Sequence, residues 1–506
     1  MIILSPLVFL SYLLATSNNG NRVTGGRGRG EVTRSDRGRG SGRGSGRGGG
    51  ADRNGRGGGG GGRGDLGRKR YNREGSKKRS SGNDSEMREE LSPLPPLTKP
   101  NGPRPFYFTC RHTYENTLID EINRYAKQLG GQVIATSPYP GLVRVEDDDG
   151  LLPTFYDPVY ALQSMPQGVV VSAESIKGIA KEVISALLGN DGDDSKVDET
   201  SAKQKERLRT AQRGSLTIHS LVPGMCKGQT KPVMQHRSEK VGEEIGKMMK
   251  KMFPAARKAA VDYEGNIIYP SERWIIQMML QSPNIVVASL VECQKSGPGR
   301  NAYWPNHLHP LGLAKVDIEE KMPSSAYRKL MEGLECMGIS PTSTTTVVDL
   351  GASPGGWTGV MRRLGCYVVA VDRSQLDPAL MRDEMVEFVK GDAFTFEPAM
   401  VGEGRDCWMI SDVIAYPERC TELLNRWCEG KWASNMIVTM KFQGDEPDLD
   451  ELDSAIQVVE SHNYDCRVKH FFNNKNEVTF MVSEKAGSPL DLDVGILGSA
   501  MFPITL

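Results

Sequence analysis

The segment 347–357 constrains the fold of this chain more than any other part of it. It reads Val-Val-Asp-Leu-Gly-Ala-Ser-Pro-Gly-Gly-Trp. Residues 347–350 are typical of a buried strand, and the glycines after them allow a tight turn and a close approach of the backbone to a ligand. A helix that starts near Trp357 would direct its first amides toward that ligand. A strand, a Gly-rich turn and a helix form the first unit of a cofactor-binding α/β domain.

From Pro323 onward, apolar strands and amphipathic helices are expected to alternate. The pattern predicts helices at 324–337, 357–364, 418–429 and 449–462, and strands at 345–350, 367–371, near 388, 407–411, 436–440, 466–471 and 477–482. This order is typical of a doubly wound α/β domain that ends in an antiparallel pair of strands.

Two α+β regions are expected before that domain. Strands at 106–110, 132–137 and 141–146, with helices at 115–129 and 175–188, predict a small α+β domain over 105–189. Residues 190–206 are polar and rich in charge, which favours an insertion loop. A strand at 214–221, a helix at 238–252 and strands at 274–280 and 285–291 then predict a second unit over 190–293, which an irregular linker over 294–322 follows.

The N-terminal region 1–104 has a different composition. Residues 21–80 hold 18 Lys and Arg against 5 Asp and Glu, a net charge of +13 in a chain whose formal net charge is zero. Arg-Gly and Gly-Ser units with almost no apolar side chains predict disorder. Arginine binds phosphates and stacks on bases, so this RGG-type tail favours RNA contact over the alternative of a flexible spacer. Residues 81–104 read as a Pro-rich linker, and 491–506 as a C-terminal tail.

The apolar run at residues 1–15 is too short to span a bilayer comfortably and has no Lys or Arg before it. We expect no stable membrane insertion; an organelle-targeting element, a weak anchor and a mis-set start codon remain open. The nine cysteines form no CxxC pair and no zinc-spaced cluster with histidine. They predict no metal site and reduced, mostly buried thiols in an intracellular compartment (cytoplasm, nucleus, nucleolus or organelle) rather than secretion.

The spacing of the turn and two acidic residues indicate the cofactor. A dinucleotide site requires G-x-G-x-x-G, whereas this turn has Gly351, Gly355 and Gly356. Asp372 ends the next strand, where a carboxylate can accept hydrogen bonds from both ribose hydroxyls. Asp392 follows the strand after that and can reach an adenine amino group. The alternative for each acid is a helix N-cap or a loop position.

S-adenosylmethionine carries a ribose, an adenine and a sulfonium but no phosphate, so it is the predicted cofactor. The turn residues expected to contact its methionine and ribose are Ser353, Pro354, Gly355 and Gly356.

Residues 349–357, together with the Ser-Ala-Tyr-Arg-Lys-Leu segment at 325–330, resemble the FtsJ-like ribose 2′-O-methyltransferases. Over 105–485 the chain is similar to the RlmM type, the bacterial large-subunit ribosomal RNA cytidine 2′-O-methyltransferases, most clearly at 408–413, 440–441 and 476–479. The resemblance implies a ferredoxin-like domain over 105–189, a THUMP-like RNA-binding domain within 190–293 and a Rossmann-like methyltransferase domain over 323–490.

The resemblance also implies a catalytic Lys-Asp-Lys-Glu tetrad, which falls on Lys329, Asp412, Lys441 and Glu477. A ribose hydroxyl is a poor nucleophile, so its proton must leave as the oxygen attacks. Lys441 is the candidate base and must be neutral to act, a form that the like charge of Lys329 and partial burial both favour. Asp412 and Glu477 are expected to hold the lysines, and Asp412 also to lie beside the sulfonium. A lone Lys or Glu at the end of a strand is more often a solvated surface charge.

The chain departs from the RlmM type at three places. A serine three residues before the first tetrad lysine contacts the cofactor in that type, and here the position is Ala326, with Ser325 beside it. The Arg-Gly tail and the segment 190–206 are absent from the bacterial pattern.

The leading hypothesis is a methyltransferase of ribosomal RNA, with RNA and not DNA as its partner and no prediction of oligomeric state. The alternatives are a non-catalytic RNA-binding or ribosome-assembly protein, or a 2′-O-methyltransferase of cap, messenger or transfer RNA. The glycine spacing disfavours a nicotinamide dehydrogenase.

Deletion of residues 1–100 should weaken RNA binding and reduce its dependence on salt, because the removed cations release counterions from RNA. Affinity for S-adenosylmethionine should not change. Binding isotherms at several salt concentrations test this expectation, and an unchanged salt slope would show that the tail is only a spacer.

Overall fold

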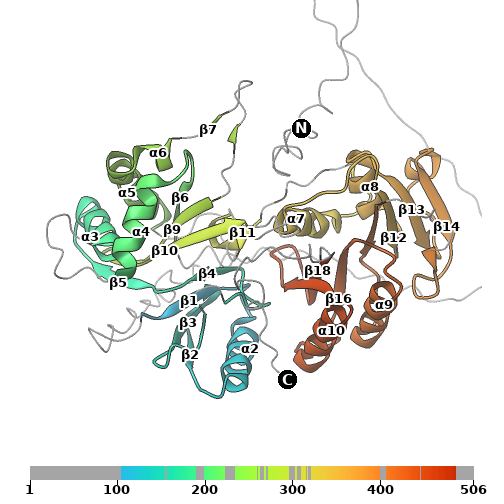
Figure 1. Ribbon diagram of the computed structural model, residues 1–506, viewed down its shortest axis with the longest axis horizontal. Coiled ribbons are helices and arrows are strands. Elements are labelled where there is room, and N and C mark those ends of the chain that lie inside the picture. Colours follow the sequence, from blue (N-terminus) through green and yellow to red (C-terminus); the bar gives the residue numbers. More distant parts are fainter. Residues whose placement is uncertain are drawn as a thin grey trace, which may run out of the picture. The chain divides into compact units, whose positions relative to one another are not determined.

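The computed structural model describes residues 104–485 except 154–155, 190–198, 223–233, 259, 262–266, 269–271, 296–302, 305–308, 315, 317–318, 320, 399–405 and 445 (Figure 1). The Arg-Gly tail, the Pro-rich linker and the C-terminal tail lie outside these residues. Among the helices that are described, none has the length and apolar character needed to cross a membrane.

A seven-stranded sheet forms the C-terminal domain (Figure 1). Its strands are β12 (Thr346–Leu350), β13 (Tyr367–Asp372), β14 (Val386–Lys390), β15 (Cys407–Ser411), β16 (Asn435–Lys441), β17 (Tyr464–Lys469) and β18 (Glu477–Glu484). Their order is β14-β13-β12-β15-β16-β18-β17; the first five are parallel, and β18 runs antiparallel to both of its neighbours. The predicted doubly wound domain with a terminal antiparallel pair is confirmed.

Helices cover both faces of this sheet, because alternate residues of each strand point to opposite sides. On β12, Val347 packs in one apolar cluster with residues of α7 (Tyr327–Met337) and α8 (Gly356–Arg363). Its neighbour Val348 packs in another cluster with residues of α9 (Pro417–Glu429) and α10 (Leu449–Ser461). Every residue of β12 is buried, as expected for a central parallel strand.

A four-stranded antiparallel sheet forms the N-terminal module, which we define as residues 104–165. Its strands are β1 (Phe106–Thr109), β2 (Ile134–Tyr139), β3 (Leu142–Glu146) and β4 (Gln163–Met165), in the order β2-β3-β1-β4. Helix α2 (Glu115–Gln128) buries Leu118 and Ile122 in the same cluster as Phe106 and Val143. The three predicted strands and the helix are confirmed, whereas β4 was not predicted.

A second sheet contains β5 (Val169–Ser172), β6 (Leu216–Leu221), β9 (Glu272–Ser282), β10 (Ile285–Lys295) and β11 (Tyr303–Trp304). The order is β11-β10-β9-β6, and β5 also pairs with β10. Helices α3 (Ile176–Leu188), α4 (Glu199–Thr210), α5 (Gln235–Met252) and α6 (Pro254–Arg257) contribute to its core, and a small hairpin joins β7 (Ala260–Val261) to β8 (Ile267–Ile268). Strand β5, which precedes residue 189, therefore belongs to this second sheet, and helix α3 packs in its core.

The expectation of a loop at 190–206 was wrong for its second half, where α4 forms. Its sequence, Glu-Thr-Ser-Ala-Lys-Gln-Lys-Glu-Arg-Leu-Arg-Thr, is rich in good helix formers, and the buried Leu208 attaches it to the core. The high charge of this segment suggested a loop, but a polar helix can form with few apolar contacts. Residues 190–198 lie outside the described chain.

Cys407 is partly buried, and six further cysteines are buried: Cys110, Cys336, Cys366, Cys420, Cys428 and Cys466. Burial raises the pKa of Cys420 to about 12 and that of Cys336 to about 11, so these thiols are unreactive at neutral pH. This agrees with the expected structural role of the buried thiols.

A largely buried group of charges joins the N-terminal module to β17. Arg467 Nη2 lies 2.9 Å from Asp157 Oδ2, and Lys469 Nζ lies 2.8 Å from Asp157 Oδ1. Lys469 also donates to the carbonyl of Pro158 at 2.6 Å. Burial alone would raise the pKa of Asp157, but the charges of Arg467 and Lys469 outweigh it and hold the pKa below its ordinary value.

The variant Asp157→Ala should lower the free energy of unfolding by about 3 kcal/mol or more, because it leaves two buried cations without their carboxylate. The matched control is Arg124→Ala, which removes exposed pairs with Asp450 and Asp453 and should cost less than about 1 kcal/mol. Urea titration of both variants measures the difference. Equal losses would show that the Asp157 group does not stabilise the fold.

Candidate active site

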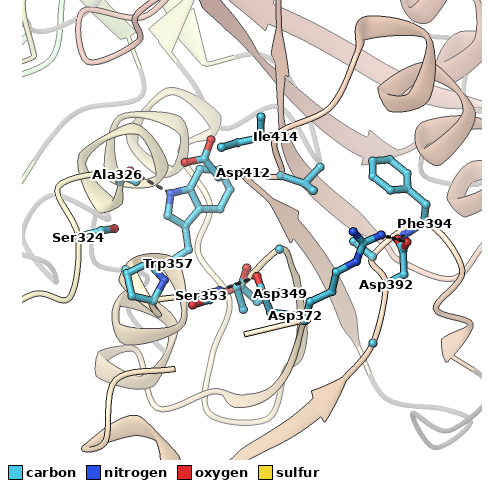
Figure 2. A pocket seen from close by; sticks show the side chains of 18 of the residues that line it. Ser324, Ala326, Asp349, Ser353, Trp357, Asp372, Asp392, Phe394, Asp412 and Ile414 are labelled. Atoms are coloured by element: carbon cyan, nitrogen blue, oxygen red, sulfur yellow. Dashed lines mark hydrogen bonds and ion pairs between the residues drawn. The ribbon is translucent and has the colours of Figure 1, made fainter. Parts of the chain in front are cut away.

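A cavity of about 440 Å³ lies at the carboxyl ends of the parallel strands (Figure 2). The segments that follow β12, β13, β14 and β15 line it, and Lys441 at the end of β16 completes the wall. Ligands of open α/β sheets bind at this edge, because loops from neighbouring strands diverge there. The volume is in the range of small-molecule sites.

The Gly-rich turn forms one wall of the cavity. Gly351 and Gly355 have φ values of +77° and +110°, in the region that favours glycine. A Cβ atom at Gly355 would also lie 2.3 Å from Leu380 Cδ1. Of the four turn residues predicted to contact cofactor, Ser353, Pro354 and Gly356 line the cavity, and Gly355 supports the turn without lining it.

Asp372 and Asp392 both lie in the cavity wall (Figure 2). Asp372 accepts hydrogen bonds from the amides of Ser353, at 3.0 Å to Oδ2, and Ser374, at 2.7 Å to Oδ1. These bonds fix the carboxylate and leave lone pairs on both oxygens for a ligand.

Asp392 is held by two different donors. The amide of Phe394 donates to its Oδ1 at 2.9 Å, and its Oδ2 pairs with the exposed Arg373. The Phe394 amide and then Arg373 hold the pKa of Asp392 below its ordinary value. A pair this exposed is weak, so a ligand can replace Arg373 as the partner of Asp392.

The four predicted tetrad residues meet at one point, although they come from α7, the segment after β15, the end of β16 and the start of β18. Lys329 Nζ lies 2.7 Å from Asp412 Oδ1 and 3.0 Å from Glu477 Oε1. Lys441 Nζ lies 3.1 Å from the same Asp412 Oδ1 and donates to the carbonyl of Asp412 at 2.6 Å.

Strand register accounts for part of this meeting. Antiparallel pairing of β16 with β18 places Lys441 directly opposite Glu477. Thr439 lies two residues before Lys441, on the same face of β16, and its Oγ1 donates to Asp412 Oδ1 at 2.7 Å. Sequence reasoning missed Thr439; the period of two along β16 was the only signal for it.

Only part of the tetrad faces the cavity. Asp412 and Lys441 line it, whereas Lys329 and Glu477 do not. The side chain of Lys441 is 20% exposed, against 9% for Lys329 and 7% for Glu477. Lys329 and Glu477 therefore form a buried support behind the two residues that a ligand can touch.

Comparison with protein families agrees with this geometry. Residues 322–426 match the model of the FtsJ-like methyltransferase family. This part of the chain is similar to the FtsJ-like methyltransferases.

Three curated relatives are each named ribosomal RNA large subunit methyltransferase M. The chain is 28% identical to that of Shewanella sediminis over 187 residues (35% of this chain, 51% of the relative). The values are 29% over 187 residues for Halorhodospira halophila (36% and 52%) and 30% over 204 residues for Chromohalobacter salexigens (38% and 54%). The chain spans about half the length of these relatives.

The FtsJ-like domain also has cavity residues that sequence reasoning missed, among them Ser324, Asp349 and Phe394. Of the two positions left open before the first tetrad lysine, Ala326 lines the cavity, and its carbonyl accepts from Trp357 Nε1 at 2.9 Å (Figure 2). Ser324, rather than Ser325, provides the hydroxyl in the wall.

Asp349 is a buried acid that lines the cavity of the FtsJ-like domain. Thr358 Oγ1 donates to its Oδ2 at 2.6 Å, and only 1% of the residue is exposed. Burial raises the pKa of Asp349 to about 7, and the Thr358 bond only partly opposes this. Because the folded pKa is raised, Asp349 favours folding most at low pH, and this contribution is lost as pH rises through the window from about 4 to about 7.

The variant Asp349→Asn should therefore lose less stability than the unchanged protein between pH 4 and pH 7, since the amide does not ionise and still accepts from Thr358. Thermal unfolding of both proteins across this window tests the expectation. The difference between their curves isolates Asp349 from the other carboxyls. Parallel curves would show that Asp349 does not titrate in this range.

Proposed function

We propose that the protein is an S-adenosylmethionine-dependent RNA ribose 2′-O-methyltransferase that acts on ribosomal RNA. One observation carries the proposal: two lysines converge on one carboxylate oxygen, and one of them, Lys441, faces a cavity that the FtsJ-like domain forms beside its Gly-rich turn. Ribosomal RNA as substrate rests on the names of the relatives.

The cavity has the donors and acceptors that S-adenosylmethionine requires. In the proposal Asp372 accepts from the ribose hydroxyls, Asp392 accepts from the adenine amino group, and Ser353, Pro354 and Gly356 lie along the methionine part. The carboxylates of Asp372, Asp392 and Asp412 favour a positively charged ligand over one with phosphates. When bound, the cofactor would supply a methyl group on a sulfonium, whose electrophilic carbon a ribose oxygen can attack.

Lys441 is the proposed general base. Lys329 contacts two carboxylates and is nearly enclosed, so it is suited to a supporting role. Lys441 shares the oxygen that Lys329 and Thr439 already use, and it alone of the two lysines lines the cavity. In its neutral form its Nζ takes the proton of the ribose hydroxyl, and the Asp412 carbonyl and carboxylate then hold the ammonium that forms.

Other parts of the chain have proposed roles in RNA binding. Ile414 and Tyr416 follow Asp412 and are 86% and 60% exposed, which leaves apolar surface beside the cavity on which a base can rest. The sequence predicts a basic patch made of Lys227, Lys231, Lys240, Lys247, Lys250 and Lys251. On α5, Lys240 and Lys247 pair with Glu243 and Glu244, which weakens this patch. Lys227 and Lys231 of that patch lie outside the described residues.

The domain assignment also remains a proposal. We assign a ferredoxin-like fold to the four-stranded N-terminal sheet and a THUMP-like fold to the second sheet, and we move the boundary from 189 to near 168, because β5 pairs with β10. We further propose an intracellular, reducing compartment, in agreement with the buried cysteines.

The variant Lys441→Ala should lose at least about 100-fold in methyl transfer, the size of general-base catalysis, while its affinity for S-adenosylmethionine changes little. The matched control is Lys390→Ala, an exposed lysine that ends β14 as Lys441 ends β16. Transfer of labelled methyl groups to ribosomal RNA and calorimetry with the cofactor give the two measurements. Full activity of Lys441→Ala would contradict the assignment of the base.

Mapping of ribose methylation in cellular RNA, with and without the protein, tests the substrate. Loss of a site in ribosomal RNA is the expected result. Loss only in cap, messenger or transfer RNA would move the substrate to that class, and an unchanged map together with no transfer in vitro would favour a non-catalytic RNA-binding protein.

A further inference from the structure

The segment 470–476 joins β17 to β18, and Glu477 follows it immediately as the first residue of β18. We refer to this segment as the β17–β18 turn. Its shape decides where the Glu477 carboxylate lies, and that carboxylate is one of the two that hold Lys329. The residues that hold this turn therefore act indirectly on the proposed active site, through the position of Glu477.

Helix α7 holds the β17–β18 turn by hydrogen bonds. Glu332 lies one helical turn after Lys329 and is fully buried. Its carboxylate accepts from the amides of Phe472 and Asn473, each at 3.0 Å, and from Asn473 Nδ2 at 2.8 Å. The helix that carries Lys329 thus also fixes the approach to Glu477.

The turn is also tied to the segment that follows Lys441. Asn476 Nδ2 donates to the carbonyls of Phe442, at 3.2 Å, and Gly444, at 2.7 Å, and the amide of Phe442 donates to the carbonyl of Asn476 at 3.0 Å. Movement of the turn would consequently reach the end of β16 as well as the start of β18.

The N-terminal module also forms hydrogen bonds to the β17–β18 turn. Arg111, just after β1, donates through Nη1 to the carbonyl of Asn474 and, at 3.0 Å, to that of Lys475. Tyr114, just before α2, donates to the Lys475 carbonyl at 3.1 Å. These contacts join residues more than 350 positions apart in the chain.

The ring of Tyr114 packs against the ring of His470. It lies 4.1 Å, between ring centroids, from the fully buried His470, which donates through Nε2 to the Lys475 carbonyl at 2.8 Å. Burial, and then the charges of Arg111 and Lys469, lower the pKa of His470 to about 3, so the ring is neutral at physiological pH. The Lys475 carbonyl therefore accepts from three side chains, those of Arg111, Tyr114 and His470.

We propose that Arg111 and Tyr114 are positioning residues of the active site: by holding the carbonyls of the β17–β18 turn, the N-terminal module sets the positions of Glu477 and Lys441. This inference rests on the proposed function. It gives the N-terminal module a role in methyl transfer that is separate from binding RNA.

The expected size of the effect follows from geometry. Loss of the Arg111 guanidinium leaves two turn carbonyls without their charged donor and lets the turn relax. A displacement of about 1 Å in a catalytic constellation can cost about 100-fold in rate. We therefore expect Arg111→Ala to lower kcat about 10- to 100-fold, with little change in affinity for S-adenosylmethionine, because neither Arg111 nor the turn lines the cofactor cavity.

The test compares four variants of the full chain. Arg111→Ala should show the full loss of kcat, Arg111→Lys should recover part of it, and Tyr114→Phe, which keeps the ring and removes one donor, should show a smaller loss. The matched control is Arg124→Ala, which breaks contacts between α2 and α10 but none to the turn. It should leave kcat unchanged. KM for RNA and the melting temperature are measured on each variant.

Amide hydrogen exchange gives a readout that does not depend on activity. Arg111→Ala should speed exchange at the amides of residues 474–477, and Arg124→Ala should not. If the unchanged protein transfers no methyl group, the proposed function fails, and exchange still decides whether Arg111 fixes the turn.

Three results would overturn the proposal. The first is an unchanged kcat in Arg111→Ala. The second is a rise in KM for RNA at constant kcat, which would make Arg111 an RNA contact. The third is unchanged exchange at the turn.

Discussion

A single oxygen atom, Oδ1 of Asp412, holds the candidate active site together. Lys329 approaches it to 2.7 Å, Thr439 to 2.7 Å and Lys441 to 3.1 Å. Two ammonium groups at such distances would repel each other strongly in a partly buried site if no carboxylate lay between them. Asp412 lies within ion-pair distance of both lysines, and Glu477 gives Lys329 a second carboxylate. The positions of α7, β16 and β18 around this point all depend on these ion pairs.

The sheet divides the two tasks of the site between its halves. Strands β12, β13 and β14 lead into the Gly-rich turn, Asp372 and Asp392, which is the side suited to a nucleoside-type ligand. Strands β15, β16 and β18 provide Asp412, Lys441 and Glu477 on the other side. Asp412 follows β15, next to the central strand β12, and is where the halves meet. A ligand that binds the Gly-rich turn would therefore lie in the same cavity as the side chain of Lys441.

The sequence predicted the C-terminal sheet well because buried parallel strands and amphipathic helices leave strong local patterns. The tetrad was placed by resemblance, and the structure brings those four residues together. Three features gave weaker signals. Strand β4 has three residues, too few for a periodicity; α4 is polar; and β5 joins a sheet whose other strands come much later in the chain.

The contacts of Thr439, Asp349 and Arg111 were beyond prediction for a different reason. Each depends on a partner that tertiary structure supplies: Asp412 for Thr439, burial for Asp349, and carbonyls more than 350 residues away for Arg111. Local composition contains no trace of such distant pairings. Register along β16 indicated only that Thr439 and Lys441 share a face.

The order of strands in the sheet differs from their order in the chain, since β18 lies between β16 and β17. During synthesis β16 emerges from the ribosome first, and its unpaired edge, with the apolar residues Met436, Ile437 and Val438, has no partner until β18 is made. Such an edge invites pairing with other chains. Until residues 477–484 are made, that edge can pair with other chains, and the same strand that covers it brings Glu477 opposite Lys441.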